Sequence, residues 1–404
     1  MKCRVCGGRV KTFFDLGRQP LANSLLENPR QSEKKYPLAL NHCSYCGSVQ
    51  LNYTVNPKTL FSKYVWVTGT SSTARSFSNV FYKELARRTP DSRKNYVLEV
   101  ASNDGTFLLP FSKRGYRVIG LDPAANIAKI AEKNGVPTKV AFWGPKAAKK
   151  ILNERGPARI IFARNVLAHV ANLQDFVKGL ALCLHEDGVL AIEVHYAAKI
   201  LKELQYDSIY HEHLCYFTFG PLERLLKQSG LFVFDLFEGP ISGGSLIVYA
   251  SKNHRPATKA VQILRQREMK AGLYSFKTWQ NFGLRAFLHR KEFLLMLNKI
   301  KEGKVPVVGW GASARSSTLL NFCGIGPDSI PVIADQNKLK QGLYTAGTHM
   351  PIISPEVAMK LNPKFIVLLG WNFAAEIMES LKRRFHYRGN CLVPLPNRPK
   401  VIKL

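Results

Sequence analysis

Four consecutive residues of this 404-residue chain carry groups suited to proton transfer: Tyr210, His211, Glu212 and His213. They follow residues 97–105, in which an apolar strand pattern leads into a polar loop that ends in glycine and could hold a nucleoside. Imidazole titrates near neutrality, so His213, with Glu212 beside it, is a candidate general base next to a bound cosubstrate. The alternative interpretation is a turn whose histidines only pack and hydrogen-bond.

The loop upstream reads E-x-A-x-N-D-G and favours S-adenosylmethionine, because it holds one glycine where a dinucleotide loop needs three. Asp122 ends the next predicted strand, where its carboxylate could accept hydrogen bonds from both hydroxyls of a ribose. Glu99, at the tip of the first strand, could orient the loop or reach the ammonium group of the ligand. The predicted cofactor-binding residues are Glu99, Ala101, Asn103, Asp122 and Asn165.

The candidate base and the cofactor-binding residues can lie close together only if the strands that precede them end at the same edge of one sheet. Short apolar runs alternate with amphipathic segments, which indicates an α/β fold with a doubly wound, largely parallel sheet. Asn165 and His169 follow the apolar run at 159–163 and would lie over the cofactor at the carboxyl edge of the sheet. The predicted strands are residues 96–101, 117–121, 159–163, 188–195, 231–237 and 245–250, and the first helix is residues 106–114.

A second nucleotide-type unit is predicted near the C-terminus. A strand at 306–309 leads through a glycine-bearing loop into a helix, and further strands follow at 330–334 and 365–369. Such a loop presents backbone N–H groups and a helix N-terminus to an anion. The predicted substrate-binding residues, with a cation and hydroxyls for phosphate oxygens, are Arg315, Ser317 and Thr318. A helix-packing glycine with surface hydroxyls is the alternative.

Two C-x-x-C-G motifs mark the N-terminal segment, with the cysteines Cys3, Cys6, Cys43 and Cys46. A glycine after each pair permits the tight turn in which two thiolates reach one ion, and four thiolates complete the closed tetrahedral shell of a structural zinc site. Four unrelated free thiols are the alternative. The other cysteines are scattered singly, and the first residues lack an apolar signal core, so we expect a reducing, cytoplasmic location.

Basic residues outnumber acidic ones by 58 to 28, which leaves a net charge of +30. A surface of this kind would attract phosphates on a nucleotide-linked substrate, on nucleic acid or on anionic lipid. A solvated basic surface with no specific partner is the alternative. No stretch approaches the roughly 18 consecutive apolar residues that a membrane span requires, so no membrane partner is expected.

Taken together, these motifs resemble the three-domain sugar-nucleotide C-methyltransferases of deoxysugar biosynthesis. The resemblance covers essentially the whole chain, including both cysteine motifs, Glu99–Gly105, Asn165–His169, Tyr210–His213, residues 243–246, residues 309–321 and residues 370–373. It implies a zinc-binding N-terminal domain at 1–68, a class I S-adenosylmethionine-dependent methyltransferase domain at 69–253, a helical connector at 254–304, and a C-terminal Rossmann-like nucleotide-sugar-binding domain at 305–404.

The resemblance also implies a reaction. A nucleoside diphosphate 4-keto-6-deoxysugar would lose its C3 proton to His213, assisted by Glu212, and the enolate would attack the methyl group of S-adenosylmethionine. Tyr210, His169 and Tyr64 would line the sugar site, and Arg315 would stand in place of the family's usual lysine at the nucleotide diphosphate. We expect a monomer or homodimer. The rival function is a basic RNA- or DNA-binding methyltransferase, which the charge does not exclude.

The chain departs from the family pattern at four positions: Ala101 and Ser316 replace glycines, Ser242 replaces a histidine and Ser317 replaces an asparagine. These changes bear on which sugar and nucleotide are used more than on the type of reaction.

Overall fold

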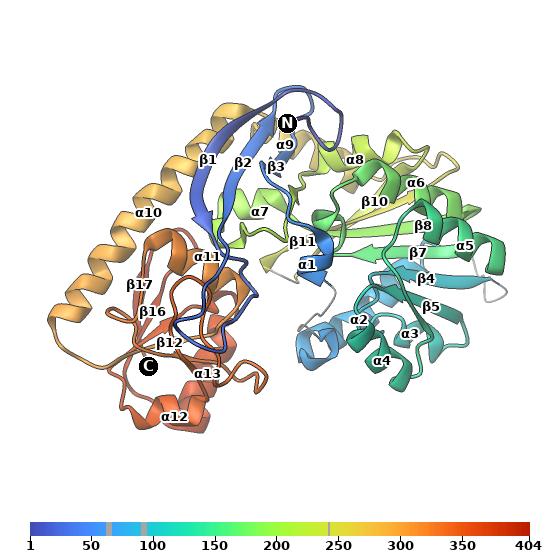
Figure 1. Ribbon diagram of the computed structural model, residues 1–404. Coiled ribbons are helices and arrows are strands. Elements are labelled where there is room, and N and C mark those ends of the chain that lie inside the picture. Colours follow the sequence, from blue (N-terminus) through green and yellow to red (C-terminus); the bar gives the residue numbers. More distant parts are fainter. Residues whose placement is uncertain (62–66, 90–94, 241–242) are drawn as a thin grey trace.

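The computed structural model describes residues 1–61, 67–89, 95–240 and 243–404. Within these residues the strands form three sheets of four, seven and six strands. Figure 1 shows the seven-stranded sheet on one side, the C-terminal sheet on the other, and the N-terminal strands above the space between them. No helix of the described residues is long and apolar enough to cross a membrane.

The N-terminal sheet is antiparallel and includes a strand from a distant part of the chain. Its order is β1-β2-β3-β9, in which β9 pairs Tyr216 with Val49 and Cys215 with Gln50. Because β9 begins two residues after His213, the candidate base is attached directly to this sheet. The strands are β1 (Val10–Gln19), β2 (Tyr36–Cys43), β3 (Val49–Leu51) and β9 (Cys215–Tyr216), and the short helix α1 (Pro57–Phe61) follows β3.

The seven-stranded sheet has the order β10-β11-β8-β7-β4-β5-β6. Its first five strands along the chain are parallel. From β4 the chain adds β5 and β6 on one side and then β7 and β8 on the other, so the strand order reverses between β4 and β7, the point at which a doubly wound sheet opens a crevice for ligands. This confirms the predicted sheet, although its last two strands form an antiparallel hairpin. The strands are β4 (Tyr96–Val100), β5 (Arg117–Asp122), β6 (Thr138–Val140), β7 (Ala158–Arg164), β8 (Leu184–His195), β10 (Phe232–Gly239) and β11 (Ser245–Ser251).

Helices cover both faces of this sheet, because alternate strand residues point to opposite sides. Val97 packs in one apolar cluster with residues of α2, α3 and α4, whereas Leu98 packs in another with residues of α5, α6 and α8. The bounds are α2 (Ser72–Ala86), α3 (Leu109–Ser112), α4 (Ala125–Lys133), α5 (Pro145–Arg155), α6 (Leu173–Cys183), α7 (Ala197–Lys202) and α8 (Phe219–Lys227). The helix predicted at 106–114 is shorter, since Pro110 has no N–H to bond to the carbonyl of residue 106.

Two helices connect the sheets, α9 (Lys259–Lys270) and α10 (Phe276–Glu302). The 27 residues of α10 span about 40 Å at 1.5 Å per residue and run along the N-terminal strands toward the C-terminal sheet (Figure 1). Phe14 of β1 packs edge-on against Phe282 and Phe287, with ring centroids 5.9 and 5.5 Å apart. Phe282 is buried in the core, whereas Phe287 is 43% exposed.

The C-terminal sheet has the order β14-β13-β12-β15-β16-β17, parallel except for β17. The second Rossmann-like unit is present as predicted, but its second strand is shorter than residues 330–334, since Pro331 cannot donate to a neighbouring strand. The elements are β12 (Val307–Trp310), α11 (Ala314–Cys323), β13 (Ile333–Ala334), β14 (Ile352–Ile353), α12 (Pro355–Lys360), β15 (Phe365–Leu368), α13 (Ala374–Phe385), β16 (Asn390–Val393) and β17 (Lys400–Lys403).

Candidate active site

The four N-terminal cysteines meet at one point, with all four sulfur atoms within 4.8 Å of one another. Cys3 Sγ lies 3.6 Å from Cys46 Sγ, and Cys6 Sγ lies 3.6 Å from Cys43 Sγ. Each pair sits in a tight turn in which a glycine N–H, from Gly7 or Gly47, donates to the carbonyl of the first cysteine. The backbone φ angles there, 74° and 73°, are those that glycine adopts without strain.

This arrangement fits zinc. Tetrahedral Zn–S bonds of about 2.3 Å place neighbouring sulfurs about 3.8 Å apart, close to the separations here. The Cys3 thiol beside it and burial both raise the pKa of Cys46, so several thiolates at this spacing need a cation between them. The four cysteines would hold the ion in a closed shell that stabilises the N-terminal sheet.

The cofactor loop leaves β4 with two residues in the left-handed region, Ala101 at φ 58° and Asn103 at φ 49°. The resemblance described above implies a glycine at position 101, and glycine adopts this conformation without strain. Asp122 holds the loop, since one oxygen accepts from the N–H of Asn103 and the other from the N–H of Ala124, each at 2.9 Å. The predicted ribose acceptor therefore lies against the loop, at the carboxyl end of β5.

Glu99 provides a test of whether the crevice suits a cationic cofactor. It is 3% exposed, burial raises the pKa of its carboxyl group well above its usual range, and Arg164 opposes that shift. Its Oε2 atom has no hydrogen-bond partner among the described residues, and neither does Ser102 Oγ nearby in the chain. A buried acceptor without a partner is costly, so a donor group of a ligand would satisfy it. The residues present thus fit S-adenosylmethionine, whose ammonium is such a donor.

A short turn after the zinc segment covers the cofactor loop. This turn, η1 (Thr68–Thr70), donates from the N–H of Thr68 to Asn103 Oδ1 and from the N–H of Gly69 to Asp104 Oδ2, both at 2.8 Å. A side chain at position 69 would come within 2.5 Å of that carboxylate, so the close approach requires glycine. Tyr64, predicted to line the sugar site, lies outside the described residues.

The candidate base, His213, is held by two hydrogen bonds of known direction. Its Nδ1 lies 2.9 Å from the backbone carbonyl of Ser208, which can only accept, so Nδ1 carries the proton. Its Nε2 is then the unprotonated nitrogen, and it accepts from the Tyr210 hydroxyl at 2.9 Å. Burial lowers the pKa of His213 well below its usual range, helped by the nearby His169, His195 and Arg315 charges. The ring is therefore a neutral base with a defined tautomer.

His169 faces this ring, with centroids 5.1 Å apart, at the end of η2 (Leu167–His169). Its Nδ1 donates to the backbone carbonyl of Glu212 at 2.7 Å. Asn165, with φ 51°, turns the chain between β7 and η2, and its N–H donates to the carbonyl of Glu193. The structure thus brings Tyr210, His169 and His213 together at the carboxyl edge of the sheet.

Glu212 lies in the same cluster but does not contact the His213 ring in the described residues. Its carboxylate accepts from Asn23 Nδ2 at 2.5 Å, across 189 positions of sequence. Burial raises its pKa to about 7, and the Asn23 hydrogen bond lowers it. The prediction that Glu212 assists His213 as a base is therefore not supported by a direct contact between the Glu212 carboxylate and the His213 ring.

The predicted phosphate contacts are engaged with the chain itself. Arg315 pairs with Asp207 at 3.2 Å and donates to Gln205 Oε1 at 2.7 Å. Thr318 Oγ1 donates to the carbonyl of Ile209 at 2.8 Å, and the Ser317 hydroxyl accepts from Asn321 Nδ2 at 3.4 Å. The cation at the phosphate-type loop is instead Lys340, whose Nζ donates to the carbonyl of Ala312 at 2.6 Å.

Sequence reasoning missed several of these residues. His195 ends β8 at the same carboxyl edge, a position that marks ligand-facing residues, and its Nε2 lies 3.1 Å from Gln205 Oε1. Ser208 acts through its carbonyl, which no side-chain pattern reveals. Lys340 lies 3.6 Å from Asp335, at the end of β13, and only the fold brings the two to the loop of Ala312.

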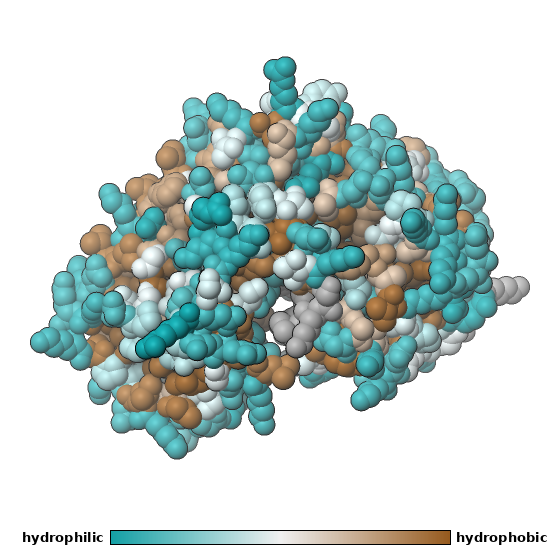
Figure 2. All heavy atoms as spheres, viewed as in Figure 1, coloured by the Kyte–Doolittle hydropathy of each residue, from teal (hydrophilic) through white to brown (hydrophobic). Residues whose placement is uncertain are grey.

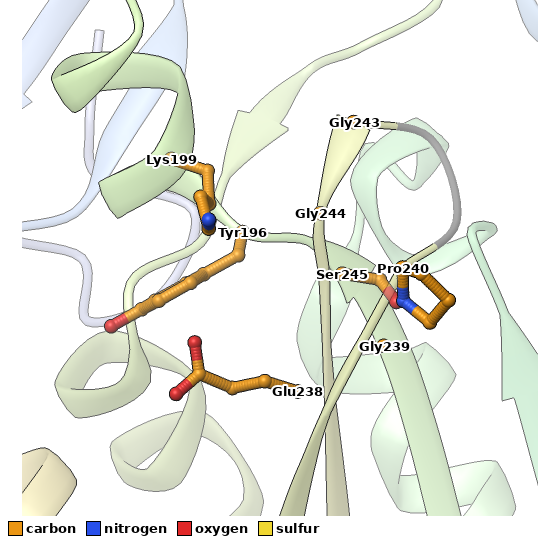
Figure 3. A pocket seen from close by; sticks show the side chains of 8 residues that line it. All are labelled: Tyr196, Lys199, Glu238, Gly239, Pro240, Gly243, Gly244 and Ser245. Atoms are coloured by element: carbon orange, nitrogen blue, oxygen red, sulfur yellow. The ribbon is translucent and has the colours of Figure 1, made fainter.

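A cavity of about 350 Å³ opens beside this network, between β10, β11 and the start of α7. Figure 3 shows Tyr196 and Glu238 on one side of it and the Gly243–Gly244 turn on the other. Gly243 connects it to the network, because its carbonyl accepts from Gln205 Nε2 at 3.3 Å. Hydrophilic side chains predominate on the face seen in Figure 2, which is hollowed between the C-terminal lobe and the seven-stranded sheet.

Three families match successive parts of the chain. They are described as "Putative zinc binding domain" at residues 3–61, "Methyltransferase domain" at residues 75–235 and "C-methyltransferase C-terminal domain" at residues 240–396. The chain is also similar to the C-methyltransferase NovU of Streptomyces niveus, with 32% identity over 408 residues that cover 99% of this chain and 96% of that one.

Two solved structures resemble part of the chain. A SAM-dependent methyltransferase from Anabaena variabilis has 17% identity and a TM-score of 0.36, covering 47% of this chain and 88% of that one. Magnesium protoporphyrin IX methyltransferase from Synechocystis, solved with bound SAM, has 12% identity and a TM-score of 0.33, covering 44% of this chain and 79% of that one.

Proposed function

This chain belongs to the S-adenosylmethionine-dependent C-methyltransferases, and we propose that it methylates C3 of a nucleoside diphosphate 4-keto-6-deoxysugar through an enolate. The observation that carries the proposal is the state of His213. A neutral imidazole whose unprotonated nitrogen accepts from a tyrosine hydroxyl is suited to remove a proton from carbon next to a carbonyl group. In this proposal the location is cytoplasmic, as expected from the sequence.

Each polar residue of the cluster then has a role. His213 Nε2 takes the C3 proton, while the Tyr210 hydroxyl turns from Nε2 to the oxygen on which the enolate charge develops, and the His169 ring lines the sugar site. Glu212 supports the cluster through its backbone carbonyl, which orients His169, and through its contact with Asn23. Tyr64 is proposed to line the same sugar site.

The methyl donor would lie in the crevice at the carboxyl edge of β4 and β5. S-adenosylmethionine, when bound, supplies an electrophilic methyl group that needs no metal. Asp122 would accept from the ribose hydroxyls and Glu99 from the ammonium group, and the turn at Ala101 and Asn103 would carry the backbone around the ligand. Asn165 would bound the crevice on the β7 side.

The nucleoside diphosphate end is proposed to bind the C-terminal lobe. The loop between β12 and α11 presents a helix N-terminus, and Lys340 adds a cation there. Arg315 and Thr318 would each have to replace a present contact in order to reach a phosphate, whereas the Ser317 hydroxyl, which accepts from Asn321, could donate to one. The sugar and the nucleotide can be identified by measuring methyl transfer to a series of keto sugar nucleotides.

The His213→Asn variant tests the mechanism. Asparagine keeps shape and polarity but cannot take up the proton, so methyl transfer should fall by about 10²- to 10⁴-fold, while calorimetry should show unchanged S-adenosylmethionine binding. The matched control is His211→Asn, because His211 Nε2 faces the carbonyls of Tyr36 and Pro37, away from the base. Wild-type protein should also exchange the C3 hydrogen of the substrate with deuterated water. Near-normal turnover of His213→Asn would assign the base to another residue and refute the mechanism.

A further inference from the structure

A three-residue helical turn, η3 (Tyr206–Ser208), lies between the two Rossmann-like units and is at most 1% exposed. It carries the carbonyl of Ser208, which accepts from His213 Nδ1. The position of that carbonyl therefore decides which imidazole nitrogen is protonated and where the free nitrogen points. Whatever holds η3 also holds the proposed base.

The groups that hold η3 come mostly from the connector and the C-terminal unit. Asp207 accepts from Trp371 Nε1 at 2.6 Å and pairs with Arg315 at 3.2 Å, and Arg315 also lies over the Trp371 ring, 4.9 Å from its centroid. Tyr206 bonds through its hydroxyl to His289 Nδ1 of α10 at 2.9 Å. These contacts tie η3 to α10 and to the C-terminal unit.

Arg315 connects η3 to Gln205 and, through Gln205, to His195 at the end of β8. Besides Asp207, it donates to Gln205 Oε1, the same oxygen that lies 3.1 Å from His195 Nε2. Its side chain is only 12% exposed, and the carboxylate it meets is 1% exposed, so the pair is shielded from solvent. A buried pair of this kind is costly to break from one side, because the other charge is left without a partner.

We propose that Arg315 is a positioning residue for the reaction: through Asp207 and η3 it holds the Ser208 carbonyl against His213 Nδ1, and so keeps Nε2 unprotonated and in place beside the Tyr210 hydroxyl, ready to accept the proton of the substrate. This inference rests on the proposed role of His213 as base. It assigns Arg315 to the alignment of the base, in contrast to the phosphate contact expected from the sequence. The C-terminal unit would then determine catalytic competence as well as substrate binding.

The first experiment reads the tautomer of His213 directly and needs no substrate. In the full-length zinc-loaded protein labelled with ¹⁵N-histidine, the two ring nitrogens of His213, assigned by comparison with His213→Asn, should show Nδ1 protonated and Nε2 free. Arg315→Gln should convert this pattern to a mixture of tautomers, whereas Arg383→Gln should not. Arg383 is the matched control, since it also pairs with a carboxylate, Glu379, but its side chain is 81% exposed on α13. An unchanged His213 pattern in folded Arg315→Gln would overturn the proposal.

Kinetics give the second readout. A displaced base costs up to about 10²-fold in rate, so Arg315→Gln should lower kcat by 10- to 100-fold with little change in the KM for the sugar nucleotide. Asp207→Asn should have a similar effect, and the double variant should be far less impaired than the two losses combined. A raised KM with unchanged kcat would make Arg315 a phosphate ligand and overturn the proposal. Should Arg315→Gln not fold, Arg315→Lys, which keeps the charge but loses the planar fork, is measured in the same way.

If the proposed function itself is wrong, the failure is visible separately. His213→Asn would then retain turnover, or the wild-type protein would not exchange the C3 hydrogen, whereas the nitrogen pattern of His213 would still respond to Arg315→Gln.

Discussion

The substitution Glu212→Gln should make the protein more stable at alkaline pH than the wild type. Burial raises the pKa of Glu212 from 4.5 to about 7, so the folded state holds a proton that the unfolded chain releases. The contribution of the Glu212 carboxyl group to the free energy of unfolding is therefore fully present below pH 4.5, and it is lost as the pH rises through 7. At about 1.4 kcal/mol per pH unit, the full loss is about 3 kcal/mol. Glutamine cannot ionise, and its carbonyl oxygen can still accept from Asn23.

The measurement is urea unfolding of both proteins from pH 5 to pH 8 in the presence of zinc. The free energy of unfolding of Glu212→Gln minus that of the wild type should grow by about 2 to 3 kcal/mol over this range. Other titrating groups are common to both proteins and cancel in the difference. Glu379→Gln, at an exposed position of α13, controls for the loss of one negative charge. A difference that stays flat with pH would mean that Glu212 is ionised throughout, with partners beyond Asn23.

Three further outcomes are expected. Removal of zinc by a chelator should disrupt the N-terminal sheet and, through β9, abolish methyl transfer in step with the loss of one zinc ion per chain measured by mass spectrometry; an active zinc-free protein would contradict this. Asp122→Ala should weaken S-adenosylmethionine binding by about 10- to 100-fold, the equivalent of roughly 1.5–3 kcal/mol for a lost charged acceptor, and unchanged affinity in calorimetry would locate the cofactor elsewhere. Burial lowers the pKa of His195 to about 3, so its neutral form stabilises the fold above pH 6.5 and this contribution is lost as the pH falls. Between pH 7 and pH 5.5 the free energy of unfolding in urea should therefore fall by about 1 kcal/mol more in the wild type than in His195→Gln. Equal decreases in the two proteins would refute the assignment.

The sheets and the cofactor crevice could be predicted from the sequence because their signals are local. Apolar runs marked the strands, and the rule that ligands bind at carboxyl ends then brought Asp122 and His169 to one edge. The two C-x-x-C-G motifs likewise predicted the cluster of four cysteines, since each knuckle is contained within a few residues. The predicted fold class and cofactors are confirmed.

The contacts that define the chemistry were not predictable in the same way. Arg315 carries no mark of its partner Asp207, which is 108 residues away, and the Glu212 contact with Asn23 depends on the N-terminal loop reaching the methyltransferase unit. The tautomer of His213 depends on a backbone carbonyl, which every residue has. Such contacts follow from how whole units dock, and periodicity within a unit contains no information about docking.

The pairing of β9 with β3 has a consequence for recombining relatives of this protein. A gene segment cut at the end of the zinc motifs would encode a sheet without its fourth strand, and the remaining piece would expose the edge of Cys215–Tyr216, next to His213. A crossover between two relatives is compatible with this pairing only if residues 49–51 and 215–216 come from the same parent. The boundaries at which this protein can be divided in evolution or in the laboratory are therefore set by the strand pairing, and they differ from those at which its sequence motifs end.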